Sequence, residues 1–481
     1  MSLKIIIIYD ETYVDPDPLK TSKNTFFHAG SPASLDYQQN LCIKTELPVK
    51  FLIGHGTVNI EKDTPKTVNP LNVLYLGESD KFSIFWNRRN YFPIGFKLRK
   101  RVLFCNSRNK SLIWVIIHVI NFIACFVAPG CLYIFADFPS SRDNYIVTQI
   151  MVGLIMICQG FVSYVDVLIW MHASSAAKGF NNIVMMEGLI KCETSDETQN
   201  KLSTQKLDPL GQFLNAFVHG LSRFGYLGPL FFTMRKLDVS YFVLRELFNP
   251  TNRSVLFSVF LYLIRLIISI SFAIELMRVL SFLLVYFTIP LKIVAYGLEN
   301  FEKFRGKLTT IEGNSKMRTL YVGVSLGVDF IAVLQGPATA MLIAFSQVLI
   351  TISSMGTIRM FGVMPMPHYL IFPGSASGAL IITLVLLPRA SYLHDQSVKL
   401  LQSWGKVASR GAVMEKSLFY KRNLVEYRAC CKAISSLRPY QIYASVAGAK
   451  LFMAKRSTKA TFFNCCADAT ISGLMSFPAE D

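Results

Sequence analysis

The sequence predicts an all-α fold: a polytopic helical membrane protein with about seven transmembrane helices and a cytoplasmic N-terminus. Composition is the first reason, because 52% of the 481 residues are hydrophobic and only 17% are charged. Such a chain cannot cover its surface with polar groups unless lipid covers much of it. The second reason is that the apolar residues gather in runs of about 20 or more, the length that crosses a ~30 Å hydrocarbon core.

Residues 1–111 form a mostly polar region that we expect to lie in the cytoplasm. Its early apolar patch, Ile5–Ile8, is shorter than the roughly 7–15 apolar residues of a signal-peptide core. Aromatic residues alternate with charged residues over Phe82–Phe96, which favours a helix lying at the bilayer interface. A dense basic cluster follows at 98–110, next to the first apolar run.

The longest apolar run, 254–297, has 44 residues, and as one helix it would be ~66 Å long, about twice the thickness of the hydrocarbon core. No Gly, Pro, Asn or Asp lies between Ser254 and Thr288, which favours one projecting helix, with two spans as the alternative. In a later run, Gly336-Pro337 favours a kink. The predicted bundle covers 112–388 and a final helix follows; the spans are 112–135, 146–170, 208–233, 254–297, 327–353, 368–388 and 457–477.

The net charge of +18 falls mainly on loops that this arrangement places in the cytoplasm. Residues 389–456 form a basic amphipathic region, and 389–459 hold 14 Lys and Arg against three acids. An excess of basic residues in cytoplasmic loops is the usual pattern in membrane proteins. Anionic lipid headgroups are a sufficient counterpart for this charge, so we expect the lipid bilayer as partner and no nucleic acid.

The loop 234–253 does not follow that pattern, because it would lie outside the cell and yet carries four basic residues. It leads into Asn252-Arg253-Ser254, an acceptor pattern for N-glycosylation, which occurs only on the outer side. Asn252 is therefore a candidate glycosylation site.

No motif in the sequence supports an enzyme. The seven histidines are scattered, and the HExxH, P-loop and CxxC patterns are absent. We expect no catalytic residue, no metal site and no cofactor. A G-protein-coupled receptor is also disfavoured, because no DRY-like triplet follows a third helix and Asn249-Pro250 lies in a loop rather than in a last helix.

Ionisable and amide side chains inside the predicted spans are candidates for function, because their insertion into lipid is unfavourable. The candidates are Asp166, the pair Glu275 and Arg278, and the pair Gln335 and Gln347. Glu275 and Arg278 are three residues apart, so they share a helix face and can form an ion pair. The glutamines also share a face and could line a ligand cavity or bond neighbouring helices. Asp166 could instead be an interfacial residue near a helix end, and Glu275 and Arg278 could lie at the interface if their helix projects beyond the bilayer.

The last apolar segment, 457–477, carries more polar residues than a helix that faces only lipid. Asn464, Asp468, Ser472 and Ser476 would suit a helix that lines a water-filled path. The alternative is that the segment does not cross the membrane, in which case Asp468 is an ordinary surface acid.

The layout resembles the arthropod gustatory and odorant receptor superfamily. The resemblance rests on seven helices, an internal N-terminus and a long basic loop before a short final helix. Ser436–Pro439 reads Ser-Leu-Arg-Pro and precedes a Gly/Ala-rich stretch, similar to the Leu-x-x-Arg-Pro-like entry of gustatory receptors. Their final Thr-Tyr-(five apolar)-Gln-Phe signature is matched here only by Thr470 and Phe477, with Ile471 and Ser476 in place of Tyr and Gln and one residue fewer.

The resemblance implies a ligand-gated cation channel of the plasma membrane, assembled as a tetramer and opened by a small organic ligand. The ligand would enter an outer pocket among the first six helices. The basic region 389–456 would anchor the subunits to one another in the cytoplasm. By position, Asn464, Asp468, Ser472 and Ser476 would line the pore. Because Ile471 and Ser476 depart from the signature, a non-conducting relative stays open.

The alternative function is a multispan transporter or another kind of channel. Transporters commonly contain internal repeats, and the two halves of this chain give no convincing duplication.

Overall fold

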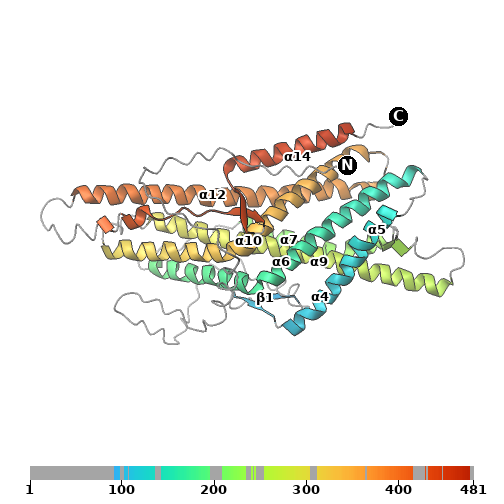
Figure 1. Ribbon diagram of the computed structural model, residues 1–481, viewed down its shortest axis with the longest axis horizontal. Helices are drawn as coiled ribbons and strands as arrows, with labels where there is room; N and C mark the ends of the chain where they lie inside the picture. Colours follow the sequence, from blue (N-terminus) through green and yellow to red (C-terminus); the bar gives the residue numbers. More distant parts are fainter. Residues whose placement is uncertain are drawn as a thin grey trace, which may run out of the picture. The chain divides into compact units, whose positions relative to one another are not determined.

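Long helices make up most of this computed structural model (Figure 1). It describes residues 92–97, 102–106, 108–135, 142–195, 209–234, 240–241, 243–244, 254–303, 311–362, 364, 366–414, 428–429, 432–446 and 448–476. The helices are α4 (Arg108–Phe122), the π-turn η3 (Ile123–Val127), α5 (Ala128–Phe135), α6 (Arg142–Ser195), α7 (Pro209–Met234), α9 (Val255–Lys303), α10 (Ile311–Arg359), α11 (Met366–Tyr369), α12 (Ile371–Met414) and α14 (Arg456–Ser476). Two antiparallel hairpins accompany them, β1 (Ile94–Lys97) with β2 (Val102–Cys105) and β3 (Tyr443–Val446) with β4 (Ala449–Met453).

Five helices in the described ranges are long and apolar enough to cross a membrane. Residues that they leave exposed include Ile267 and Leu256 of α9, at 66% and 84%, as expected of faces that contact lipid. The prediction of a polytopic, all-α membrane protein is thus confirmed. Helices α7 and α14 come from the two weaker apolar segments and are not among the five, so the number of crossings stays a prediction. The five segments are Ser111–Cys131, Gln149–Ile190, Val255–Lys303, Gly313–Arg359 and Ile371–Val407.

The long apolar run lies within one continuous helix, α9, of 49 residues. Pro290 falls inside this helix without ending it. Helix α10 likewise continues through Pro337, where the sequence favours a kink. The lack of turn residues between Ser254 and Thr288 therefore predicted the single helix correctly.

Several helices extend well beyond the predicted spans. Helix α6 has 54 residues and continues to Ser195 instead of ending near Trp170. The stretch 298–326, between two predicted spans, is helical at the end of α9 and from Ile311 onward in α10. Helix α12 reaches Met414, inside the basic region that begins at 389.

Packing explains these extensions. Ile183, Met186 and Ile190 of α6 are buried in the main hydrophobic core, while Met185 and Leu189 between them are exposed. One face of the extension is therefore packed against neighbouring helices, and this contact stabilises it. A search for continuous apolar runs detects only the part of a helix that lies in the hydrocarbon core.

The predicted interfacial helix over Phe82–Phe96 is wrong in its described part, because Ile94–Lys97 is strand β1. Phe92 and Ile94 are buried at 2% and 1% exposure, so the start of this hairpin packs inside the protein. The side-chain amide of Asn181 on α6 accepts a hydrogen bond from the Leu103 backbone N–H and donates one to its carbonyl, at 2.8 and 2.9 Å. These two bonds hold the β1–β2 hairpin against α6.

Helix α10 packs against α6, α12, α14 and the β3–β4 hairpin (Figure 1). The hairpin lies so close that a Cβ added to Gly336 would come within 2.2 Å of Ser445 Oγ. Strand β4 ends at Met453, and α14 begins three residues later. The hairpin therefore connects the middle of α10 to the start of the last helix.

Candidate functional site

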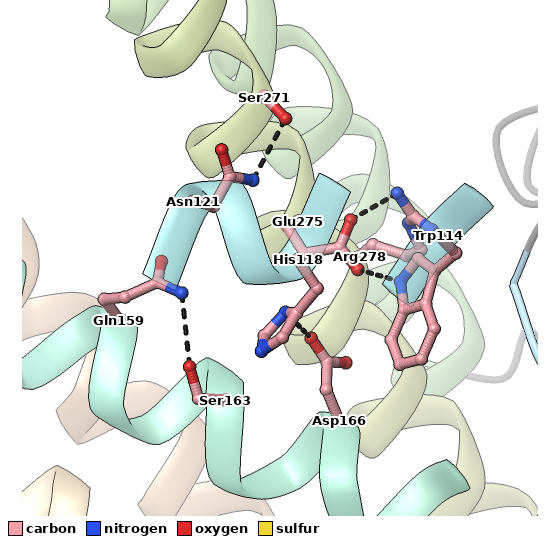
Figure 2. A network of polar contacts seen from close by, with 9 residues as sticks. All are labelled: Trp114, His118, Asn121, Gln159, Ser163, Asp166, Ser271, Glu275 and Arg278. Carbon is pink, nitrogen blue, oxygen red and sulfur yellow. Dashed lines mark hydrogen bonds and ion pairs between the residues drawn. The ribbon is translucent and has the colours of Figure 1, made fainter. Parts of the chain in front are cut away.

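A buried polar network joins α4, α6 and α9 (Figure 2). His118 Nδ1 of α4 lies 2.9 Å from Asp166 Oδ2 of α6. The Asp166 side chain is 1% exposed, so this ion-pair contact is almost completely shielded from solvent. Asp166 lies in the middle of the long helix α6 and not at a helix end.

The second part of the network is centred on Glu275 of α9. The indole Nε1–H of Trp114 donates a hydrogen bond of 2.6 Å to Glu275 Oε1, and Arg278 pairs with the other carboxylate oxygen. The structure thus contains the ion pair that the three-residue spacing predicted. The guanidinium of Arg278 also lies over the ring of Phe92, 5.3 Å from its centroid. Glu275 and Arg278 are 3% and 8% exposed, so the pair is buried as well.

Amide and hydroxyl groups extend the network along the helices. The side-chain amide of Asn121 donates to Ser271 Oγ at 3.0 Å, which adds a second bond between α4 and α9. Within α6, Gln159 donates to Ser163 Oγ at 3.2 Å. Figure 2 shows the α4 side chains directed toward α6 and α9.

Three of the residues predicted from the sequence, Asp166, Glu275 and Arg278, are thus brought together. The sequence analysis missed their partners Trp114 and His118. These two and Asn121 follow a spacing of four and then three residues, which puts them on one face of α4. That polar stripe in an otherwise apolar helix was the available signal.

Gln335 lies elsewhere, in the wall of a small cavity between α9, α10, α12 and the β3–β4 hairpin. The cavity has a volume of about 40 Å³, well below the roughly 150 Å³ of a cavity that holds benzene. Ser346 shares this wall, and Gln335 and Ser346 are 6% and 2% exposed. Gln347 is not part of the wall. The structure therefore does not unite the two glutamines in one site.

The four predicted pore residues form one exposed stripe along α14. Asn464, Asp468, Ser472 and Ser476 recur every four residues, and all four are exposed. On the opposite face of α14, Phe462 and Cys466 pack in a cluster with residues of α10 and α12. Figure 1 shows α14 lying alongside these helices.

The segment before the β3–β4 hairpin is fastened by two tyrosines that the sequence analysis did not select. The rings of Tyr321 on α10 and Tyr440 are stacked, with 4.5 Å between their centroids. Each hydroxyl donates to the backbone of the other's segment: Tyr440 to the Tyr321 carbonyl at 3.0 Å, Tyr321 to the Arg438 carbonyl at 2.9 Å. Burial, together with the nearby Tyr321, holds the pKa of Tyr440 well above its usual value, so its hydroxyl stays protonated and donates.

Two further predictions stand outside these clusters. Asn252, the glycosylation candidate, lies outside the described residues, as does Phe477 of the C-terminal signature. Within the described part of the chain, no group of three or more His, Cys, Asp and Glu side chains is placed to hold a metal ion.

No protein-family model matches the sequence, and no curated protein matches it. Solved structures do match its fold. The olfactory receptor OR5 of the insect Machilis hrabei in complex with eugenol matches with a TM-score of 0.51 at 13% identity, over 84% of this chain and 100% of the receptor chain. A second structure of that receptor gives a TM-score of 0.50 at 12% identity, over 85% and 100% of the two chains. The resemblance to arthropod chemosensory receptors is thus confirmed at the level of the fold.

Proposed function

We propose that this chain, which has the fold of the insect olfactory receptors, is a chemosensory cation channel of the plasma membrane, opened by a small organic molecule. The observation that carries the proposal is the polar stripe of α14. Asn464, Asp468, Ser472 and Ser476 are exposed in the single chain, on a helix that runs alongside membrane-length helices. A polar stripe that faced lipid would be unfavourable.

Assembly of several copies removes that difficulty. If the stripes of several subunits, four in the family it resembles, face a common axis, their polar groups contact water in a pore. The Asp468 side chains then form a ring of negative charge, which attracts cations and repels anions. The apolar face with Phe462 and Cys466 stays packed against α10 and α12 of its own chain.

The matching receptor supports the ligand class. The matching receptor was solved with eugenol, a small organic molecule. That any of the five intramembrane polar candidates contacts the ligand stays a prediction. Three of them, Asp166, Glu275 and Arg278, are bound to other side chains, and we propose that they hold helices in place rather than contact the ligand.

Electrical recording of the full chain tests the proposal. Cells that express the chain at their surface should give currents in response to a panel of small volatile organic molecules that includes eugenol. Replacing Asp468→Asn removes the charge ring, so the ratio of cation to anion permeability and the single-channel conductance should fall.

The matched control is Asp329→Asn, which removes an exposed acid on α10 that is not part of the stripe. Both quantities should stay at the wild-type value in this variant. Equal ratios of cation to anion permeability in the wild type and the Asp468 variant would show that α14 does not line the pore. Saturable ligand uptake without current would instead favour the transporter.

A further inference from the structure

The buried network of α4, α6 and α9 holds more acidic than basic side chains. Asp166 and Glu275 are negative when ionised, Arg278 is positive, and His118 is either neutral or positive. The charges that act on Asp166 come from His118, Glu275 and Arg278, and those on His118 come from Asp166 and Glu275. The β1–β2 hairpin segment contributes the uncharged ring of Phe92. With a neutral His118, the cluster therefore has a net charge of −1.

The uncompensated charge belongs to Asp166. Arg278 is paired with Glu275, which also accepts the indole hydrogen bond of Trp114. Oxygen Oδ1 of Asp166, in contrast, is buried with no hydrogen-bond partner in the part of the chain that the structure describes. A lone carboxylate with only 1% exposure is unfavourable, because neither water nor a cation stabilises it.

We infer that His118 and Asp166 form a buried proton-binding site, which keeps one proton for as long as α4 packs against α6 and α9. The proton lies either on the imidazole, giving an imidazolium–carboxylate pair, or on the carboxyl oxygen, giving an imidazole–carboxylic acid pair. Both forms make the cluster neutral, so the inference does not depend on which atom holds the proton.

Loss of the proton has a structural consequence. The cluster then carries a net negative charge inside apolar surroundings, which favours any arrangement that lets water reach Asp166. Because His118 belongs to the first membrane-length helix, such an arrangement requires α4 to move from α6. Proton binding and the packing of α4 are therefore linked, whether or not the chain conducts ions.

The pH dependence of unfolding tests the site in the purified full chain, unfolded with sodium dodecyl sulfate in mixed micelles. An exposed histidine has a pKa of about 6.5. Above that pH, the folded state holds one more proton than the unfolded state. Stability then falls as the pH rises, and the unfolding equilibrium constant grows by roughly tenfold per pH unit beyond the contribution of other groups. Asp166→Asn makes the cluster neutral without the proton and should remove this tenfold term.

His172→Gln is the matched control, because it removes another histidine that lies on α6 outside the network. This variant should keep the full pH dependence of the wild type. Equal dependence in the wild type and in Asp166→Asn would overturn the inference.

A second measurement uses the wild type alone and decides the question if Asp166→Asn does not fold. The folded protein should show one of two signals near pH 8, a pH about 1.5 above the pKa of an exposed histidine. One is a single imidazolium in the nitrogen spectrum of histidine-labelled protein; the other is the infrared carbonyl band of a protonated carboxyl group. Finding neither would overturn the inference. Both measurements are independent of ion conduction, so they can fail or succeed separately from the channel proposal.

Discussion

At the scale of residues, the network shows how an apolar helix accommodates polar groups. Trp114 is 4% exposed, and its single N–H donates to a buried carboxylate at 2.6 Å. A hydrogen bond to a charged group in such surroundings contributes more than one between neutral groups, because water does not compete for it. Trp114 therefore joins α4 to α9 by a bond as well as by contact area.

Replacing Trp114→Phe leaves Glu275 Oε1 without this donor and should lower the free energy of unfolding by about 1–3 kcal/mol beyond the loss of volume. The matched control is Trp404→Phe, since Trp404 is 1% exposed and its indole N–H has no partner among the described residues. Unfolding in sodium dodecyl sulfate, followed by circular dichroism, gives both values. A loss no larger at Trp114 than at Trp404 would show that the hydrogen bond adds nothing.

At the scale of elements, the β3–β4 hairpin is the link between the helix bundle and α14. Tyr440 fastens the chain just before it, through stacking on Tyr321 and through Ser397 Oγ, which accepts from the Tyr440 backbone N–H at 3.0 Å. Gly336 gives β3 room to contact α10. After the hairpin, Arg456 at the start of α14 forms an ion pair with Asp395 of α12 at 2.6 Å. These contacts tie the start of the last helix to both α10 and α12.

Replacing Gly336→Ala tests this link, because the new methyl group would overlap Ser445 Oγ. We expect the hairpin to move from α10, with a stability loss of about 1–3 kcal/mol and a reduced ligand-evoked current. Gly378→Ala on α12, where an added Cβ meets nothing within 4 Å, should be neutral or slightly stabilising. Adding Ser445→Ala to the Gly336 variant should restore part of the loss, and additive effects in this double-mutant cycle would argue against direct overlap.

At the scale of the whole molecule, an odd number of crossings remains the central expectation. The five membrane-length helices, together with α7 and α14, would give seven spans. That number places the two ends of the chain on opposite sides of the membrane.

An epitope tag at each end measures the orientation. A tag after Asp481 should stain intact cells, and a tag before Met1 should stain only permeabilised cells. Staining of both tags only after permeabilisation, with surface delivery verified by biotinylation, would mean an even number of crossings and would rule out the predicted topology of α14.

Hydropathy predicted most of the fold because burial in lipid requires long apolar runs, and such runs are visible in sequence. It could not predict that α6 continues to Ser195, because that extension is stabilised by contacts with distant helices. It also could not predict strand β1, whose partner β2 and anchor Asn181 lie farther along the chain. Within the site, the Glu275–Arg278 pair was predictable because both residues share one turn of helix. Its partner Trp114 was not, since it lies 161 residues away.

The π-helical segment η3 changes which residues of the first membrane-length helix share a face. A π-turn contains one residue more than an α-helical turn, so side chains beyond Val127 are rotated by about 100° relative to a regular continuation of α4. The stripe formed by Trp114, His118 and Asn121 therefore has no continuation in α5, and the two halves of the helix present independent faces. Removing one residue between Ile123 and Val127 would restore a regular helix and bring both halves into a single phase. Insertions and deletions at this turn would therefore rotate the faces of α5 while leaving the polar network unchanged.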